Sequence, residues 1–130
     1  MGFNAGQANT GGAFNTFIGN LSGVSNNIGN QNTFIGDSSG MANTNGDANV
    51  FIGQGSGDAN QSGNENVFIG TDAGGANTGG DRNVIIGANA GLLSLASDNI
   101  FIGHNAGKTN SIANDNIFIG SGTGLNNDFG

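Results

Sequence analysis

Few side chains in this sequence of 130 residues have types that do chemistry. His104 is the only histidine, and the chain has no cysteine, tyrosine or tryptophan. A catalytic triad or a histidine metal site needs partners that such a composition does not supply. His104 stands in a variable turn, so we interpret it as a solvated loop residue. We therefore expect the protein not to be an enzyme.

Carboxylates form the second pattern of residues that could bind a ligand. Three acids stand just before the asparagine that opens an apolar run, and asparagines hold the equivalent places in other runs. The acids are Asp47, Asp81 and Asp98, and the asparagines are Asn30, Asn64 and Asn114. A ladder of such oxygens is one way to bind Ca²⁺. The nine-residue calcium-binding repeat is absent, so we favour solvated turn acids and expect no cofactor.

Recurring Asn-Thr pairs form the third pattern. They are Asn9-Thr10, Asn43-Thr44 and Asn77-Thr78. A flat polar ladder of this kind orders water in ice-binding solenoids. The threonine column is interrupted at Asn27, Gln61, Leu95, Ser111 and Asp128. These interruptions weaken an ice-binding interpretation, which stays open as an alternative.

The charge balance excludes some partners. The chain has 2 basic residues against 9 acidic ones, which gives a net charge of −7. Two cations cannot neutralise a phosphate backbone, so we expect no nucleic-acid binding. No apolar run approaches the roughly 18–20 residues of a membrane span. The N-terminal residues lack a basic region and an apolar run, so no signal peptide is recognised.

A fixed repeat organises the whole chain. The string Phe-Ile-Gly recurs, with Ile85-Ile86-Gly87 as its one variant. The eight coils defined by its glycine start near Gly2, Gly19, Gly36, Gly53, Gly70, Gly87, Gly103 and Gly120. The spacing is 17 residues, except for one interval of 16 between Gly87 and Gly103. A disordered glycine- and asparagine-rich tract would not keep this register, so residues 1–130 are predicted to form a single repeat domain.

The repeat unit itself predicts the fold. Position 5 is always glycine, position 4 is always small, and position 14 is asparagine in every complete copy. The only strong secondary-structure signal is the β-branched and aromatic run at positions 15 to 17. One strand per 17 residues, joined by glycine turns, is typical of a β-solenoid. We therefore predict an all-β parallel β-solenoid (β-roll) of about eight coils, with a hydrogen-bonded asparagine ladder. The ladder residues are Asn15, Asn32, Asn49, Asn66, Asn83, Asn99 and Asn116.

Strand parity separates two apolar columns, because successive side chains point to opposite faces. We expect position 17 in the core together with position 15, and position 16 outside in a self-association ladder between chains. The expected inner core is Ile18, Ile35, Ile52, Ile69, Ile86, Ile102 and Ile119. The expected self-association ladder is Phe17, Phe34, Phe51, Phe68, Ile85, Phe101 and Phe118. The alternative is a local bulge that turns the phenylalanines inward as well.

The strings Asn-Thr-Phe-Ile-Gly and Asn-Val-Phe-Ile-Gly, followed by Ala-Gly-x-Ala-Asn-Thr, resemble head repeats of trimeric autotransporter adhesins. They are equally similar to repeats in phage tail-fibre proteins. The resemblance covers essentially the whole chain. It implies a left-handed β-roll, association of three chains and a role in surface attachment. The small residue that this family places between its inward apolar positions is phenylalanine here, and the family's membrane anchor and coiled-coil stalk are missing from this sequence.

Two departures from the repeat complete the pattern. The 16-residue coil carries Leu92, Leu93 and Leu95 where its neighbours have small or polar residues, which indicates a filled packing defect or, alternatively, a local docking patch. The extra rings Phe3, Phe14 and Phe129 lie in the terminal coils, where we expect end contacts. Uncovered strand edges there favour head-to-tail stacking.

The function expected from these features is structural and non-catalytic. We expect an extracellular or cell-surface fibre of an adhesin, filament or tail-fibre-like appendage, with the chain itself as partner in a homo-oligomer or filament. The alternative is a ligand-binding solenoid that recognises ice, a carbohydrate or a host surface.

Overall fold

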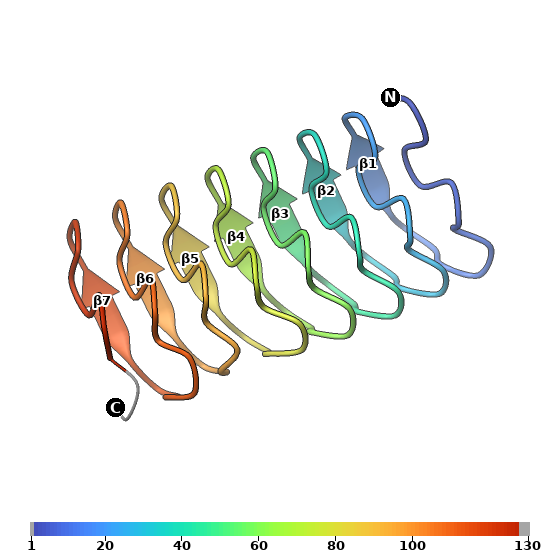
Figure 1. Ribbon diagram of the computed structural model, residues 1–130. Coiled ribbons are helices and arrows are strands. Elements are labelled where there is room, and N and C mark those ends of the chain that lie inside the picture. Colours follow the sequence, from blue (N-terminus) through green and yellow to red (C-terminus); the bar gives the residue numbers. More distant parts are fainter. Residues whose placement is uncertain (1, 128–130) are drawn as a thin grey trace.

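The computed structural model describes residues 2–127 and forms a rod of stacked coils (Figure 1). The described part contains seven short strands and no helix. The strands are β1 (Thr16–Ile18), β2 (Thr33–Ile35), β3 (Val50–Ile52), β4 (Val67–Ile69), β5 (Val84–Ile86), β6 (Ile100–Ile102) and β7 (Ile117–Ile119). The predicted parallel β-solenoid is confirmed.

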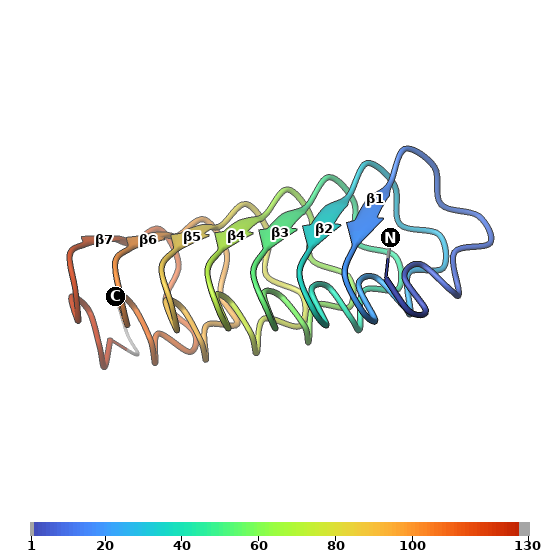
Figure 2. The same ribbon diagram turned by 90° about the horizontal axis from the view of Figure 1, so that it is seen from above.

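The seven strands form one parallel sheet in sequence order, and each strand pairs only with the strands of the coils before and after it. The register repeats at every step, so that Phe34 pairs with Phe51 and Phe51 with Phe68. Figure 2 shows the coils side by side along the rod. Equivalent residues therefore form columns that run the length of the molecule.

The interior of the rod is built on the phenylalanine column. Phe34, Phe51, Phe68 and Phe101 have no exposed surface, and Phe17 and Phe118 pack against them at the two ends. Neighbouring rings are stacked: the centroids of Phe34 and Phe51 lie 4.8 Å apart with an interplanar angle of 5°. Nearly parallel rings whose centroids lie at this separation fall within the range of favourable aromatic pairs.

The expected orientation of the strands was therefore wrong. Position 16 points inward, and positions 15 and 17 point outward. The residues expected to associate between chains, Phe17, Phe34, Phe51, Phe68, Ile85, Phe101 and Phe118, lie inside the rod. The residues expected in the core, Ile18, Ile35, Ile52, Ile69, Ile86, Ile102 and Ile119, are half-buried or exposed. No bulge is required, since ordinary alternation turns the ring inward and both flanking side chains outward.

Alternation also explains why the ring belongs inside. Position 14 has the same parity as position 16, and Asn32, Asn49, Asn66 and Asn83 are fully buried. One aromatic ring per coil, with a small residue at position 4 and two asparagines, fills the narrow interior. Ser39 shows how closely this interior is built, since its hydroxyl donates to the Phe51 carbonyl oxygen at 3.0 Å.

Two asparagine columns satisfy the buried polar groups. At position 14, the Asn49 side chain accepts from the Asn66 backbone N–H at 3.0 Å and donates to the Gly63 carbonyl at 2.7 Å. At position 8, Asn43 donates to the Asn26 side-chain oxygen at 2.6 Å. The position 8 column joins coils 1 to 4 and stops at Asn60. The position 14 column continues through the 16-residue step from Asn83 to Asn99.

Glycine is required at position 5 for two independent reasons. At Gly40 the backbone has φ +58°, and a Cβ would lie 2.5 Å from the Phe34 ring. L-residues with a side chain adopt this left-handed conformation at a cost, and glycine does not. The ring of each coil therefore packs directly against a bare backbone, which is why position 5 never varies.

The left-handed conformation recurs at position 13, where the residue is not glycine. Ala48 has φ 56° and Glu65 has φ 58°. A Cβ in this region costs about 1–2 kcal/mol, and glycine adds roughly 0.5–1 kcal/mol of unfolded-state entropy. We expect Ala48→Gly to raise the free energy of unfolding by about 0.5–1 kcal/mol, because strain relief exceeds that entropy.

Chemical denaturation would measure this gain. Ala42→Gly is the matched control, because Ala42 has no positive φ. That substitution should lower the free energy of unfolding by about 0.5–1 kcal/mol. Equal losses at both positions would show that position 13 carries no backbone strain.

Two of the columns are interrupted, one in the 16-residue coil and one in the coil before it. Ile85 replaces phenylalanine between Phe68 and Phe101. Ser94 replaces the position 8 asparagine, and its hydroxyl has no hydrogen-bond partner. The unpaired atoms Asn60 Oδ1 and Asn77 Nδ2 lie on the same column. The coil is thus a packing irregularity, and Leu93 and Leu95 do not fill it, because both are exposed.

Candidate functional site

The side chains that could act in catalysis or metal binding do not lie close together in this rod. His104 is exposed in a turn, where its Nδ1 lies 3.3 Å from the Asn105 side-chain nitrogen. Within residues 2–127, no three His, Asp or Glu side chains are grouped to hold a metal ion. The same range contains no helix with the length and apolarity needed to cross a membrane. The remaining candidates are surfaces.

The acids before the strands join neighbouring coils through hydrogen bonds. Asp47 and Asp81 alternate with Asn30 and Asn64 in one column, where each side-chain oxygen accepts a backbone N–H from the preceding coil. The Asn30 N–H donates to Asp47 at 2.6 Å, and the Asn64 N–H donates to Asp81 at 2.7 Å. Ser97 takes the next place in this column by accepting from the Asp81 N–H. Asp98, which the sequence grouped with these acids, is displaced by one position in the shortened coil.

Asp98 instead pairs with one of the two basic residues. Arg82 donates to its two carboxylate oxygens from Nε at 2.7 Å and from Nη2 at 2.8 Å. The hydrogen bond to Arg82 lowers the pKa of Asp98, and the same bond raises the pKa of Arg82. The pair is exposed to solvent, so its contribution to stability is small.

The pKa of Asp58 is raised, in contrast to that of Asp98. Burial raises the pKa of its carboxyl group, and repulsion from Asp72 adds to the shift. A folded-state pKa above the unfolded value means that the charged form destabilises the fold at neutral pH, and that this penalty disappears as pH falls through the folded pKa. We expect Asp58→Asn to raise the thermal midpoint at pH 7. The gain should vanish below the ordinary carboxyl pKa of about 4.

Thermal scans of both proteins across this pH range would measure the effect. A gain that persists undiminished in acid would show that burial and repulsion do not act on this carboxylate.

The first candidate surface is the outer face of the sheet, which we call the sheet face. Positions 15 and 17 form its two columns, separated by one residue along each strand and in register from coil to coil. Position 15 contributes Thr16, Thr33, Val50, Val67, Val84, Ile100 and Ile117, and position 17 contributes the seven isoleucines described above. No charged residue occurs in either column.

The second candidate surface lies at positions 7 to 9 of the repeat, which include the Asn-Thr pairs. The structure forms no strand there, but hydrogen bonds still join neighbouring coils: Ala42 N–H donates to the Asp58 carbonyl at 2.9 Å and Thr44 N–H to the Gln61 carbonyl at 3.0 Å. Positions 7 and 9 flank the buried position 8, and their side chains reach the surface. We call this surface the lateral face. Its columns are Ala8, Ser25, Ala42, Ala59, Ala76, Leu93 and Thr109, and Thr10, Asn27, Thr44, Gln61, Thr78, Leu95 and Ser111.

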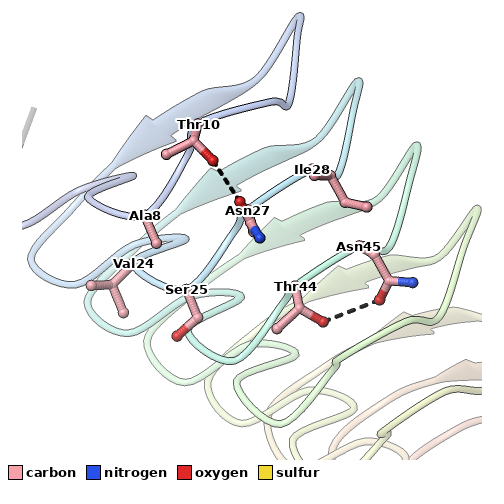
Figure 3. A pocket seen from close by; sticks show the side chains of 8 residues that line it. All are labelled: Ala8, Thr10, Val24, Ser25, Asn27, Ile28, Thr44 and Asn45. Carbon is pink, nitrogen blue, oxygen red and sulfur yellow. Dashed lines mark hydrogen bonds between the residues drawn. The ribbon is translucent and has the colours of Figure 1, made fainter.

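The lateral face is hollowed over the first three coils (Figure 3). The hollow is open and has a volume of about 620 Å³. Its lining is Ala8, Thr10, Val24, Ser25, Asn27, Ile28, Thr44 and Asn45. The Thr10 hydroxyl donates to the Asn27 side-chain oxygen at 2.6 Å, and the Thr44 hydroxyl lies 3.1 Å from the Asn45 side-chain oxygen.

The third candidate region is the first coil. Phe3 is 74% exposed and Phe14 is 85% exposed. These two predicted end contacts therefore present apolar surface to solvent. Phe129, the third of them, falls outside the described residues.

Sequence reasoning missed the sheet face, and it recognised the lateral face only through its Asn-Thr pairs and its leucines. The outward direction of positions 15 and 17 was indicated by Thr16 and Thr33, since a threonine is easier to place at a surface than in a core. The hollow has no local sequence signal, because it arises from small side chains in successive coils. Comparison of the chain with protein-family models, curated proteins and solved structures finds no match.

Proposed function

We propose that this chain is a non-catalytic structural β-solenoid that self-associates into a fibre. We place it in an extracellular adhesin, a surface filament or a tail-fibre-like appendage, the setting that the resemblance of its repeat strings implies. Its buried polar groups support a structural role, because most of them are used in bonds between coils.

The observation that carries the proposal is the constancy of the step from one coil to the next. Strand N–H groups donate to the following coil with the same geometry each time: Thr33 to Asn49 and Val50 to Asn66, both at 2.8 Å. Each coil also donates backwards, as Gly53 does to Ile35 at 2.8 Å. A coil of the same repeat added at either end meets the donors and acceptors that it meets inside the rod, and such edges template further strands.

Charge supports stacking at the ends. Residues 2–36 contain no charged side chain, and neither do residues 116–127. In a chain with net charge −7, the first coil thus carries no acid and the last coil carries one, Asp128. Stacked end coils would gain backbone hydrogen bonds without bringing like charges together.

Electron microscopy of the purified 130-residue chain tests the proposal. We expect unbranched filaments longer than one rod. A polar segment containing proline and lysine, appended after Gly130, should shorten or abolish them, because neither residue type extends a strand edge easily. A glycine-serine segment of the same length is the matched control and should leave filaments in place. Equal length distributions for the two fusions would refute axial stacking.

A second candidate function is favoured by the sheet face. Its two columns of β-branched side chains repeat with the regularity of the strands, at about 4.7–4.9 Å between coils. A regular array of this kind suits a crystalline ligand such as ice better than a soluble molecule. Inhibition of ice recrystallisation measures this activity. Val67→Lys should abolish it, and Gln54→Lys, at an exposed turn position, should not.

A further inference from the structure

The lateral face carries a hollow over its first three coils and two exposed leucines, Leu93 and Leu95, further along the rod. We propose that two copies of this chain pair through their lateral faces in an antiparallel, two-fold arrangement, in which Leu93 and Leu95 of each copy enter the hollow of the other. This pairing rests on the proposed function of the chain as a self-associating rod, and names a contact that holds rods side by side.

The two leucines project from the face. Leu93 is 47% exposed and Leu95 is 49% exposed, although both are large apolar side chains. At the same positions, other coils carry alanine, serine, threonine, asparagine or glutamine. A pair of exposed leucines that no packing inside the molecule requires is a candidate contact with another molecule.

Backbone hydrogen bonds show that the leucines share the columns of the hollow. Leu93 N–H donates to the Lys108 carbonyl at 2.8 Å, as Ser25 N–H donates to the Met41 carbonyl at 3.2 Å. Leu95 N–H donates to the Ser111 carbonyl, as Asn27 N–H donates to the Thr44 carbonyl. The missing residue of the 16-residue coil therefore lies after Leu95, and the leucines stand on the same face as the hollow.

The positions along the rod allow both contacts at once. The hollow spans coils 1 to 3 and is centred on coil 2, whereas the leucines belong to coil 6. A two-fold axis through coil 4, beside Ala59 and Gln61, places coil 2 of one copy against coil 6 of the other. The same axis makes the reverse contact, as a two-fold interface requires. The separation of about 19 Å is identical in both rods, because four coils rise by four strand spacings.

Charge and area favour a second copy as the occupant. In coils 1 to 7 the columns at positions 7 and 9 contain no charged residue, although the chain has a net charge of −7. Asp128 takes position 9 in the last coil, and Asp58 and Lys108 border the columns at position 6. An acidic rod can therefore approach its copy through these columns without pairing like charges within them. The face measures about 500 Å² per copy from strand and coil spacings, which is typical of a weak, reversible interface.

The test uses the chain with the polar cap after Gly130, so that axial stacking does not contribute. Sedimentation velocity over a concentration series should show a reversible dimer. Leu93→Ala combined with Leu95→Thr should weaken it at least tenfold, and because these residues occur at the same positions in other coils, the fold should be kept. Ser25→Gln, which fills the hollow, should weaken it equally. Ile35→Thr on the sheet face is the matched control and should leave the dimer unchanged.

Mixing the two weakened variants gives the decisive result. The leucine variant keeps its hollow, and the Ser25→Gln variant keeps its leucines, so one of the two contacts is restored in a mixed dimer. We expect the mixture to associate more tightly than either variant alone. A mixture no tighter than its components, or a dimer that weakens only with Ile35→Thr, would overturn the pairing.

Filaments of the uncapped chain separate this inference from the proposed function. If the leucine variant still forms filaments but only as single rods, lateral pairing is supported within the fibre. If the wild-type chain forms no filaments while its capped form dimerises through the leucines, axial stacking fails and the pairing stands. Filaments of unchanged width in the leucine variant would contradict the pairing and leave the fibre proposal intact.

Discussion

Phe51→Ala is expected to lower the free energy of unfolding by about 3–5 kcal/mol, the usual cost of removing a buried ring. The Phe51 ring has no exposed surface and stacks on Phe34 and Phe68 at 4.8 Å on both sides. Its removal leaves a cavity that the bare backbone at Gly57 cannot fill. Denaturant unfolding followed by circular dichroism measures the loss.

Two controls sharpen this experiment. Phe14→Ala removes a ring that is 85% exposed and should change stability by less than about 0.5 kcal/mol. Phe51→Ile copies the natural residue at Ile85 and should cost less than about 1.5 kcal/mol. If Phe14→Ala and Phe51→Ala cost the same, the column does not form the core.

Asn49→Ala is expected to be nearly as damaging as loss of a ring, although it removes a polar side chain. It leaves the Asn66 N–H inside the rod without its partner and removes the shorter of two hydrogen bonds to the Gly63 carbonyl, which keeps the one from Asn60. An unsatisfied buried group costs about 1–3 kcal/mol and a lost hydrogen bond about 0.5–1.5 kcal/mol, so a loss of roughly 2–4 kcal/mol follows. Hydrogen exchange should show the opening at the coils on both sides of residue 49.

Asn45→Ala is the comparison for that prediction. Asn45 is exposed, and its side-chain oxygen lies near the exposed Thr44 hydroxyl. A change below about 0.5 kcal/mol is expected. Similar losses for both variants would show that the ladder at position 14 adds nothing beyond an ordinary surface amide.

The repeat period was sufficient to predict the architecture. Seventeen-residue spacing, one β-branched segment per coil and invariant glycine leave few alternatives to a parallel solenoid. Period alone does not determine which face of a three-residue strand points inward, because both faces are apolar here. The deciding information was in the asparagine at position 14, which shares the face of the phenylalanine and bonds across the interior.

The surfaces could be predicted only in part. Leu93 and Leu95 were recognised as departures, with a packing defect preferred to a docking patch, yet their exposure requires the register of the shortened coil. The hollow requires knowledge of which small side chains lie side by side. Both depend on contacts between residues about 17 apart, which hydrophobic periodicity along the chain does not describe.

The interruption around the fifth and sixth coils is expected to be the weakest junction of the rod, although strand pairing continues through it. Contacts reach only the neighbouring coils, so stability is passed from coil to coil as in a one-dimensional chain. The stack of rings stops between Phe68 and Phe101, and the position 8 amides stop between Asn60 and Asn110. A rod pulled along its axis would therefore part first at this junction. The coils on either side would remain folded, because they keep their own stacked rings and hydrogen bonds.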